Sequence, residues 1–354
     1  MYFGNVFFRV CECSNDFCKR RFLQVQNAKT APFSVGIFVD LRSGRENIAP
    51  MKRRYISFVA AVLLCGCACV ETPEPAEFTV ASFNVGFCKD PSDVRRWDAR
   101  KNLIMPLVEF HGFDIVGMQE PMGFQVDYLA AQSDKYAVAG QIVRNLTLAE
   151  VSEKSAAKNI DNMLRNMNNP IFYRRDKFEL LDSGKFYFSE TPDKAERGFG
   201  GQFDSIRSCV WAKFRHIESG REFHFFNIHL CVEKYAKWHK PAAELLVKKI
   251  REIAKGGTFF VSGDFNETRS QPASLVMRGS SIAKDARENS LSKPYGTTRS
   301  TFNNYKNVSE GDMPIDFIYV SNDVAVLNFG TYTDHVDGLV PSDHYPISAR
   351  IVLR

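Results

Sequence analysis

The body of this 354-residue chain has few cysteines and almost no net charge. Beyond residue 69 only Cys88, Cys209 and Cys231 remain, which excludes a disulfide framework and a zinc site of paired cysteines. Residues 1–66 hold ten basic and four acidic residues, so residues 67–354 carry 36 basic and 37 acidic residues. A nearly neutral body does not indicate a nucleic-acid partner, although local basic patches stay possible.

The chain also lacks an apolar run of the roughly 20 residues that a membrane-spanning helix needs. Its most apolar run, residues 55–64, is short and follows the basic Lys52-Arg53-Arg54. This pattern is typical of a secretory signal. Leu64-Cys65-Gly66-Cys67 then resembles a bacterial lipobox with Cys67 as the lipidated residue. We expect residues 51–66 to be a lipoprotein signal peptide and residues 67–77 to be a tether.

An export signal normally begins a protein, whereas 50 residues precede this one. We predict that translation starts at Met51 and that residues 1–50 are a disordered extension from a misplaced start codon. The mature protein would then be lipid-anchored in a bacterial cell envelope, on a membrane facing the periplasm or the exterior. That membrane would be one of its partners, and we expect a monomer.

Residues 78–354 show no linker or short repeat, so we predict one domain. Helical patterns cover Val94–Phe110, where Pro106 should kink or divide the helix, and Pro241–Ala254, where Pro241 suits the first turn. Strands and helices in this number predict a layered α/β sandwich. Apolar runs of strand length occur at Phe78–Val85, Asp114–Met118, Lys135–Ala139, Ile171–Tyr173, Val210–Phe214, Glu222–Leu230, Thr258–Ser262, Ile315–Val320 and Ile347–Val352.

Polar side chains stand at the ends of six of these strands. They are carboxylates, amides and imidazoles, at Asn84, Glu120, His229, Asp264, Asn266, Asp316, Asp343 and His344. Each alone has a structural explanation, as a turn residue, a cap, a core histidine or half of a salt bridge. The set as a whole predicts a catalytic site.

Metal-assisted hydrolysis of a phosphate ester requires such a set of side chains. Mg²⁺ binds one or two carboxylates and keeps water and substrate phosphate at its other positions. In-line displacement needs a group that orients water and donors for the phosphate oxygens. Without cysteine or histidine clusters at zinc spacing, Mg²⁺ or Mn²⁺ is the expected cofactor.

Six motifs resemble, in order, those of the endonuclease/exonuclease/phosphatase superfamily. They are Ser82–Val85, Gln119-Glu120, Asn227–His229, Gly263–Asn266, Ile315–Ile318 and Ser342–Ile347. Phe186–Asp193 and Arg207–Ala212 also resemble the bacterial secreted branch of that superfamily. The resemblance implies a deoxyribonuclease-I-like α/β fold, a four-layer sandwich of two mixed β-sheets packed face to face with helices outside.

The resemblance also implies roles for single residues. Glu120 corresponds to the main metal ligand, with Asn84 and Asp343 near the metal. Asp264 would orient or activate the attacking water, and Asn266 would hold that water or the phosphate. His344, partnered by Asp316, would lie at the scissile phosphate; His229 would donate to a phosphate oxygen, and Arg207 is a weaker candidate for substrate contact.

One segment departs from the pattern of that branch. The branch has an aspartate directly after the His-Leu pair and an arginine at the start of the next helix, whereas this chain has Cys231 and Trp238-His239-Lys240. Substrate contacts from this segment are therefore not carried over.

These features predict a divalent-metal-dependent phosphoesterase that hydrolyses a phosphodiester or a phosphomonoester outside the cytoplasm. Two alternatives stay open: a nuclease acting on DNA or RNA, and a non-catalytic surface module that retains the fold. Phospholipid head groups, inositol phosphates and sugar phosphates are equally open as substrates.

Overall fold

Two six-stranded sheets form the centre of the unit Thr72–Arg354. The computed structural model describes the backbone of residues 6–12, 21–27 and 35–38, and it describes residues 75–87, 97–144, 168–195, 198–201, 206–297, 299–306, 308–311 and 313–353. The first sheet has the order β14 (Val324–Thr331), β15 (Ile347–Leu353), β4 (Ala76–Asn84), β5 (Ile115–Gln119), β7 (Ile171–Arg174) and β6 (Tyr136–Ala139). Its β4 and β5 run parallel and its other neighbours antiparallel.

The second sheet has the order β12 (Ala283–Asp285), β13 (Asp316–Ser321), β11 (Phe259–Asp264), β10 (Glu222–His229), β9 (Ser208–His216) and β8 (Phe178–Tyr187). Here β10 and β11 are the parallel pair. Both sheets are therefore mixed, as predicted. All nine predicted strands are present, and β8, β12 and β14 are additions that the sequence reading did not include.

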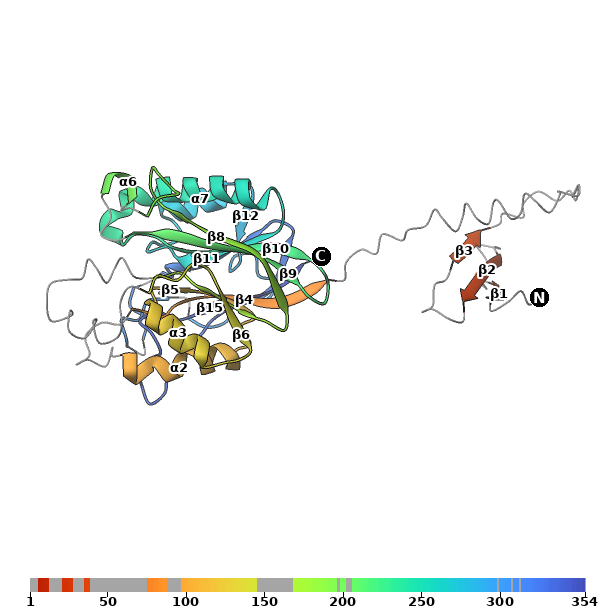
Figure 1. Ribbon diagram of the computed structural model, residues 1–354, viewed down its shortest axis with the longest axis horizontal. Coiled ribbons are helices and arrows are strands. Elements are labelled where there is room, and N and C mark those ends of the chain that lie inside the picture. Colours follow the sequence, from red (N-terminus) through yellow and green to blue (C-terminus); the bar gives the residue numbers. More distant parts are fainter. Residues whose placement is uncertain are drawn as a thin grey trace, which may run out of the picture. The chain divides into compact units, whose positions relative to one another are not determined.

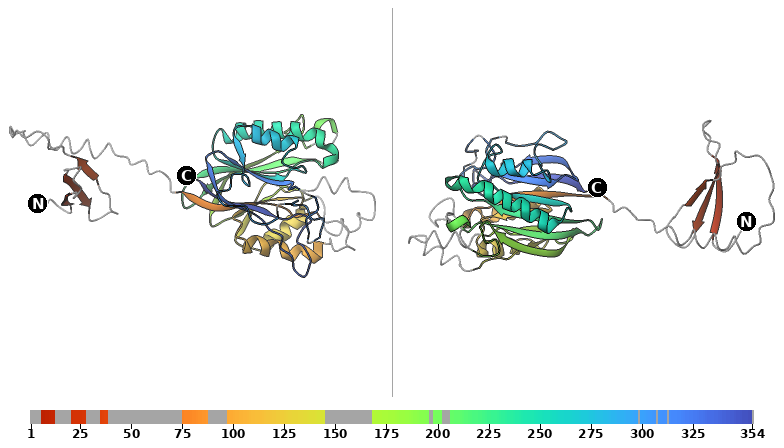
Figure 2. Two further views of the ribbon diagram at one scale, coloured as in Figure 1. Left: turned by 180° about the vertical axis from the view of Figure 1, so that it is seen from behind. Right: turned by 90° about the horizontal axis from the view of Figure 1, so that it is seen from above.

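Helices cover the two outer faces of this pair of sheets (Figure 1). The helices α2 (Trp97–Phe110) and α3 (Gly123–Ala131) lie on one side, and α7 (His239–Ala254) lies on the other. The view from behind, on the left of Figure 2, shows the same helix–sheet–sheet–helix arrangement. The predicted four-layer sandwich is confirmed. Shorter helical segments complete the described part: α6 (Gly198–Gly201), η1 (Glu233–Trp238) and α8 (Pro272–Gly279).

An aromatic cluster fills the space between the sheets at the start of β4. The ring of Phe78 lies 5.0 Å from that of Phe178 and 5.1 Å from that of Phe223, and Phe223 lies 5.4 Å from Phe260. All four side chains are buried. Burying an aromatic side chain stabilises a fold by about 1.5–3 kcal/mol, so this end of the sandwich is the stable base on which the opposite, polar end is built.

The helix α2 continues through Pro106, so of the two predicted outcomes, a kink or a division, the division does not occur. Pro106 removes a backbone donor, so the carbonyl of Asn102 loses its partner within the helix. Both residues are exposed, and water can therefore solvate that carbonyl. Pro241 lies in the first turn of α7, as expected.

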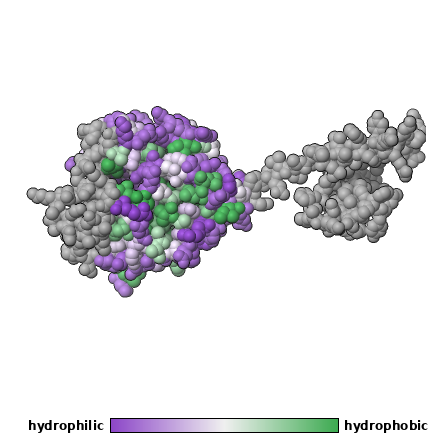
Figure 3. Space-filling model, viewed as in Figure 1, coloured by the Kyte–Doolittle hydropathy of each residue, from purple (hydrophilic) through white to green (hydrophobic). Residues whose placement is uncertain are grey.

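Three strands lie in the separate unit Met1–Glu71: β1 (Val6–Glu12), β2 (Arg21–Asn27) and β3 (Val35–Phe38), paired antiparallel in this order. The signal segment 51–66 and Cys67 lie outside the described residues, as does the tether except for its last three positions. The domain boundaries and the origin of residues 1–50 stay predictions. No helix within the described residues is long and apolar enough to cross a membrane. On the face shown in Figure 3, hydrophilic and hydrophobic residues of the unit Thr72–Arg354 are interspersed.

Candidate active site

A buried polar layer joins the two sheets directly beneath the predicted site. Gln119 Nε2 donates to Asn227 Oδ1 at 2.7 Å and to Ser82 Oγ at 3.1 Å, and Ser262 Oγ donates to Asn227 Oδ1 at 3.3 Å. These four residues come from β4, β5, β10 and β11. Gly117 makes room for the layer, since a Cβ there would lie 2.1 Å from Ser262 Oγ. Buried polar groups need such partners, so the layer fixes how the sheets register on each other.

The site residues stand one or two positions beyond this layer. Ser82 precedes Asn84, Asn227 precedes His229 and Ser262 precedes Asp264 by two residues. Because side chains two apart in a strand share a face, all three site residues point to the space between the sheets. The register also pairs His229 with Asp264, and Asp264 with Asp316.

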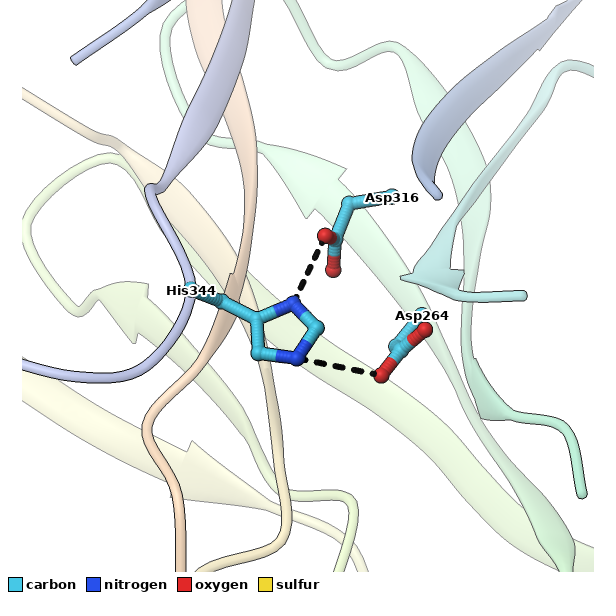
Figure 4. A group of neighbouring side chains, drawn as sticks. All are labelled: Asp264, Asp316 and His344. Carbon is cyan, nitrogen blue, oxygen red and sulfur yellow. Dashed lines mark hydrogen bonds and ion pairs between the residues drawn. The ribbon is translucent and has the colours of Figure 1, made fainter. Parts of the chain in front are cut away.

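Asp264 is the centre of the site. Its Oδ2 accepts from Asn84 Nδ2 at 3.0 Å and lies 3.5 Å from His229 Nε2 and 3.6 Å from His344 Nε2. His344 Nδ1 in turn lies 2.8 Å from Asp316 Oδ2. Figure 4 shows the His344 imidazole between the two carboxylates. This is the arrangement of a histidine whose charged form is stabilised on both sides.

Burial and these neighbours shift the acidity of the groups. Burial raises the pKa of the Asp264 carboxyl to about 7, against the charge of His344. Burial lowers the pKa of His344, but the charges of Asp316 and Asp264 outweigh it and raise that pKa to about 10. His344 is therefore an imidazolium at neutral pH, beside a carboxyl that can give up or take a proton there.

His229 is held in a different state. Burial, with the charges of Arg207 and His344, lowers its pKa well below the ordinary value. Asn266 Nδ2 donates to Leu230 O at 3.1 Å, and the same nitrogen lies 3.0 Å from His229 Nε2. We assign Nε2 as the acceptor of this contact, so His229 is neutral with its proton on Nδ1. A donor role for Nε2 toward phosphate would require Asn266 to release it.

Glu120 directly follows β5 and has a strained backbone conformation. Its φ is +74°, a region that residues other than glycine rarely adopt. Glu120 Oε2 accepts from the backbone N–H of Phe87 at 3.1 Å, and Oε1 lies 3.9 Å from His229 Nε2. The strained turn after β5 thus directs this carboxylate toward the site instead of along the strand.

Ser342 ties Asn84 to the segment of Asp343. Its hydroxyl donates to Asn84 O at 2.6 Å and lies 3.2 Å from Asp343 Oδ1. Glu120, Asn84 and Asp343 offer carboxylate and amide oxygens, the donor set that Mg²⁺ prefers. These three residues fit a divalent cation by their chemistry.

A second group could also hold a metal ion. Asp264, Asp316 and His344 each offer one ligand atom within 4.8 Å of the others. However, His344 Nδ1 and Asp316 Oδ2 already bind each other, and His344 is charged at neutral pH. A protonated nitrogen has no lone pair for a metal, so this group is better suited to proton transfer and phosphate contact.

The structure brings together the eight polar strand-end residues that the sequence predicts, whose roles stay predictions. Arg207 is buried, at 4% exposure, and its charge helps to lower the pKa of His229, which places it beside the site. Of the predicted residues only Cys67 lies outside the described part of the chain.

Sequence reasoning missed three supporting contacts. Thr301 Oγ1 donates to Asp316 Oδ2 at 2.5 Å, from a loop without periodicity. Arg100, on α2, is fully buried and binds backbone carbonyls of the segment after β4. His239 Nδ1 lies 2.9 Å from Glu267 Oε2, with both side chains fully buried. Glu267 directly follows Asn266, and a glutamate at that position was the one sequence feature that could have indicated this contact.

The sandwich and this group of carboxylates, amides and imidazoles define a phosphoesterase of the deoxyribonuclease-I-like class. The endonuclease/exonuclease/phosphatase family model matches residues 81–344. The chain therefore belongs to this family, whose members are hydrolases of phosphate esters.

Solved structures agree with this assignment. An endonuclease/exonuclease/phosphatase family protein from Bacteroides thetaiotaomicron is 27% identical, with a TM-score of 0.69 over 80% of this chain and 97% of its own. A mannosyl-6-phosphatase from the same species is also 27% identical, with a TM-score of 0.67 over 77% and 99%. The human Nocturnin catalytic domain, 16% identical over 79% of this chain and 96% of its own with a TM-score of 0.58, shares the fold. No curated protein gives a significant match.

Proposed function

We propose that this protein is a divalent-metal-dependent phosphoesterase that hydrolyses a phosphate ester by attack of water. The observation that carries the proposal is the convergence of four separate segments at Asp264 and His229. His229 Nε2 lies 3.9 Å from Glu120 Oε1 and 3.5 Å from Asp264 Oδ2, and Asp264 Oδ2 lies 3.6 Å from His344 Nε2. A non-catalytic module would not need a carboxyl with a pKa of about 7 beside an imidazolium, since holding this pair buried is costly.

In this proposal Asp264 accepts a proton from the attacking water. Asn266, whose backbone N–H donates to Asp264 Oδ1 at 2.8 Å, holds the carboxylate in place. The His344 imidazolium, fixed by Asp316, stabilises charge on the phosphate oxygens. A general base contributes about 10²–10⁴-fold to a rate, and charge stabilisation in a buried site can contribute as much.

Glu120, Asn84 and Asp343 would hold the divalent cation, and we propose Mg²⁺ or Mn²⁺ because all three donors are oxygens. When bound, the cation supplies positive charge to the phosphate. Arg207, which directly precedes β9, adds a second positive charge near His229. We propose that Arg207 contacts the substrate.

A sugar phosphomonoester is the first substrate class to test, because this chain is 27% identical to a mannosyl-6-phosphatase over nearly the whole length of that phosphatase. A nucleic-acid substrate is less favoured, since residues 67–354 are close to neutral. We further propose that the protein acts outside the cytoplasm, anchored to a bacterial envelope membrane through Cys67. A mass measurement on the N-terminal peptide of the native protein would test this: an unmodified Cys67, or any peptide from residues 1–50, contradicts it.

Hydrolysis of p-nitrophenyl phosphate and of bis-p-nitrophenyl phosphate with Mg²⁺ or Mn²⁺ tests the enzyme. We expect turnover by the wild type and a loss of at least about 10²-fold in kcat for Asp264→Ala and for His344→Ala. Asp334→Asn is the matched control, because this exposed aspartate pairs with His111 on the surface. Absence of turnover on a broad panel of phosphate esters, with metal bound, would favour the non-catalytic module.

A further inference from the structure

Arg100 is a charged residue buried completely beneath the side of the site where Glu120 and Asn84 lie. Its side chain has 0% exposure, and its guanidinium lies 5.3 Å from the ring centre of Trp97 and 5.4 Å from that of Tyr305. An arginine is almost never fully buried unless its donors are satisfied. The groups that the Arg100 N–H donors bind therefore indicate the role of this residue.

The donors of Arg100 bind backbone carbonyls of two segments. In the segment after β4 they bind Val85 O, Gly86 O at 2.8 Å and Phe87 O at 3.3 Å. In the segment before the last strand they bind Pro341 O at 3.1 Å, two residues before Asp343. One guanidinium thus links the two segments that carry the proposed metal ligands Asn84 and Asp343.

The peptide groups between these carbonyls face the site with their other side. A trans peptide holds its C=O and N–H in opposite directions. The peptide whose carbonyl is Val85 O has the N–H of Gly86, which donates to Asn84 Oδ1 at 3.0 Å. The next peptide, with Gly86 O, has the N–H of Phe87, which donates to Glu120 Oε2 at 3.1 Å. Arg100 binds both carbonyls, so both N–H groups are directed at proposed ligands.

We propose that Arg100 is a positioning residue for the metal site: it orients two successive peptide groups whose N–H groups hold the Asn84 and Glu120 side chains. Gly86 is required at the centre of this segment. Its φ is +64°, and a Cβ there would lie 2.4 Å from the Tyr305 hydroxyl and 3.0 Å from Asp343 Oδ1. The proposal rests on the proposed metal-dependent function, and it assigns no contact between Arg100 and the metal.

Calorimetric titration of the substrate-free protein with Mn²⁺ tests the proposal. We expect Arg100→Met to bind Mn²⁺ about 10–100-fold more weakly than the wild type, the usual effect of removing a group that orients metal ligands. Arg100→Lys keeps the charge but loses the planar fork, and its ammonium has only three donors for the four carbonyls, so we expect its Mn²⁺ binding to be weakened as well. In both variants kcat on p-nitrophenyl phosphate should recover at saturating Mn²⁺, which a loss of folded protein would not allow.

Lys101→Met is the matched control, since Lys101 is the next residue and its ammonium pairs with Asp98 and lies over the ring of Tyr128, away from the carbonyls that Arg100 binds. If Arg100→Met does not fold, the Mn²⁺ affinity of Arg100→Lys tests the proposal instead. Mn²⁺ affinity equal to the wild type in the folded variant, or a loss of kcat that saturating Mn²⁺ does not restore, would overturn the role of Arg100. A wild type that binds no Mn²⁺ and hydrolyses no phosphate ester would instead overturn the proposed function.

Discussion

Asp316 acts on the site through His344. Its Oδ2 binds His344 Nδ1 at 2.8 Å, and its charge is the largest contribution that raises the pKa of His344 to about 10. His229 is also buried, but burial and the positive charges of Arg207 and His344 lower its pKa well below the ordinary value. One imidazole is thus charged and the other neutral within a single site.

We expect Asp316→Asn to lower the pKa of His344 by at least about one unit, because an amide cannot offer the negative charge that favours the imidazolium. The ¹⁵N chemical shifts of the His344 ring, followed from pH 6 to pH 10, measure this directly. Asp334→Asn serves as the control for a lost surface carboxylate. A His344 ring that stays protonated above pH 9 in Asp316→Asn would contradict the assignment.

Thr301 orients Asp316 in turn. Its hydroxyl donates to Asp316 Oδ2, and its Oγ1 accepts from the backbone N–H of Asp316 at 3.2 Å. We expect Thr301→Val, which keeps the shape and removes the hydroxyl, to destabilise the fold by about 1–3 kcal/mol and to lower kcat with little change in KM. Thermal unfolding and steady-state kinetics check this; Thr301→Ser should retain most of kcat, and a Val variant with unchanged kcat would rule the role out.

The positions of the predicted site side chains could be located from the sequence because each stands beside a strand that its own apolar run reveals. The residues that hold these side chains in place could not be predicted. Thr301, Arg100 and Glu267 act through backbone groups or buried partners that are distant in sequence, and no spacing indicates such contacts. The direction of the Asn266 amide toward His229 likewise depends on Leu230 O, which only the folded structure brings within reach.

Among the strands, β5 depends on the absence of a side chain at Gly117. A Cβ there would lie 2.1 Å from Ser262 Oγ and 2.6 Å from Asn227 Cγ, both in the polar layer beneath the site. We expect Gly117→Ala to destabilise the fold by about 1–3 kcal/mol, since the layer must move. Gly279→Ala is the control, because nothing lies within 4 Å of its Cβ position. Urea unfolding curves that coincide for the wild type and Gly117→Ala would contradict the packing described.

The first turn of α7 is fixed to the site by His239. Its Nε2 binds Cys231 O at 2.7 Å and its Nδ1 binds Glu267 Oε2, which connects the segments that follow β10 and β11. Burial lowers the pKa of His239, but the hydrogen bonds with Cys231 and Glu267 outweigh it and raise that pKa to about 10. A raised pKa means that the folded state binds this proton more tightly than the unfolded state.

The stabilisation from His239 should therefore be complete below about pH 6.5, decline above it and vanish as the pH passes about 10. We expect the difference in Tm between the wild type and His239→Gln to be largest near pH 6 and smallest near pH 10.5. His335→Gln, the same change at an exposed histidine, should show no such trend. A difference in Tm that is constant over this range would exclude a charged His239.

Which strands could be predicted follows from their burial. Completely buried strands such as β5 and β11 appear as plain apolar runs. The strand β8 lies at the edge of its sheet and is mostly exposed or half-buried, so its sequence alternates weakly and it was missed. Pro106 predicted a kink or a division of α2, and the helix is not divided.

At the scale of the whole molecule, the predicted site lies entirely within the unit Thr72–Arg354. We expect a chain that starts at Thr72 to fold and to retain the kcat/KM of the full chain, because no site residue precedes Asn84. Kinetics and circular dichroism of both chains on p-nitrophenyl phosphate measure this. A shortened chain that folds but loses more than about tenfold in kcat/KM would show that residues 1–71 contribute to catalysis.

The central claim is that the residues at these strand ends form one metal-dependent phosphoesterase site. Its most direct test is the rate of p-nitrophenyl phosphate and bis-p-nitrophenyl phosphate hydrolysis after complete chelation and again after Mn²⁺ is restored. We predict that chelation abolishes the wild-type rate, that Mn²⁺ restores it, and that Glu120→Gln requires at least about tenfold more Mn²⁺ for half of its maximal rate. A wild-type rate that chelation leaves unchanged, or a Glu120→Gln variant with the wild-type Mn²⁺ requirement, would contradict the account.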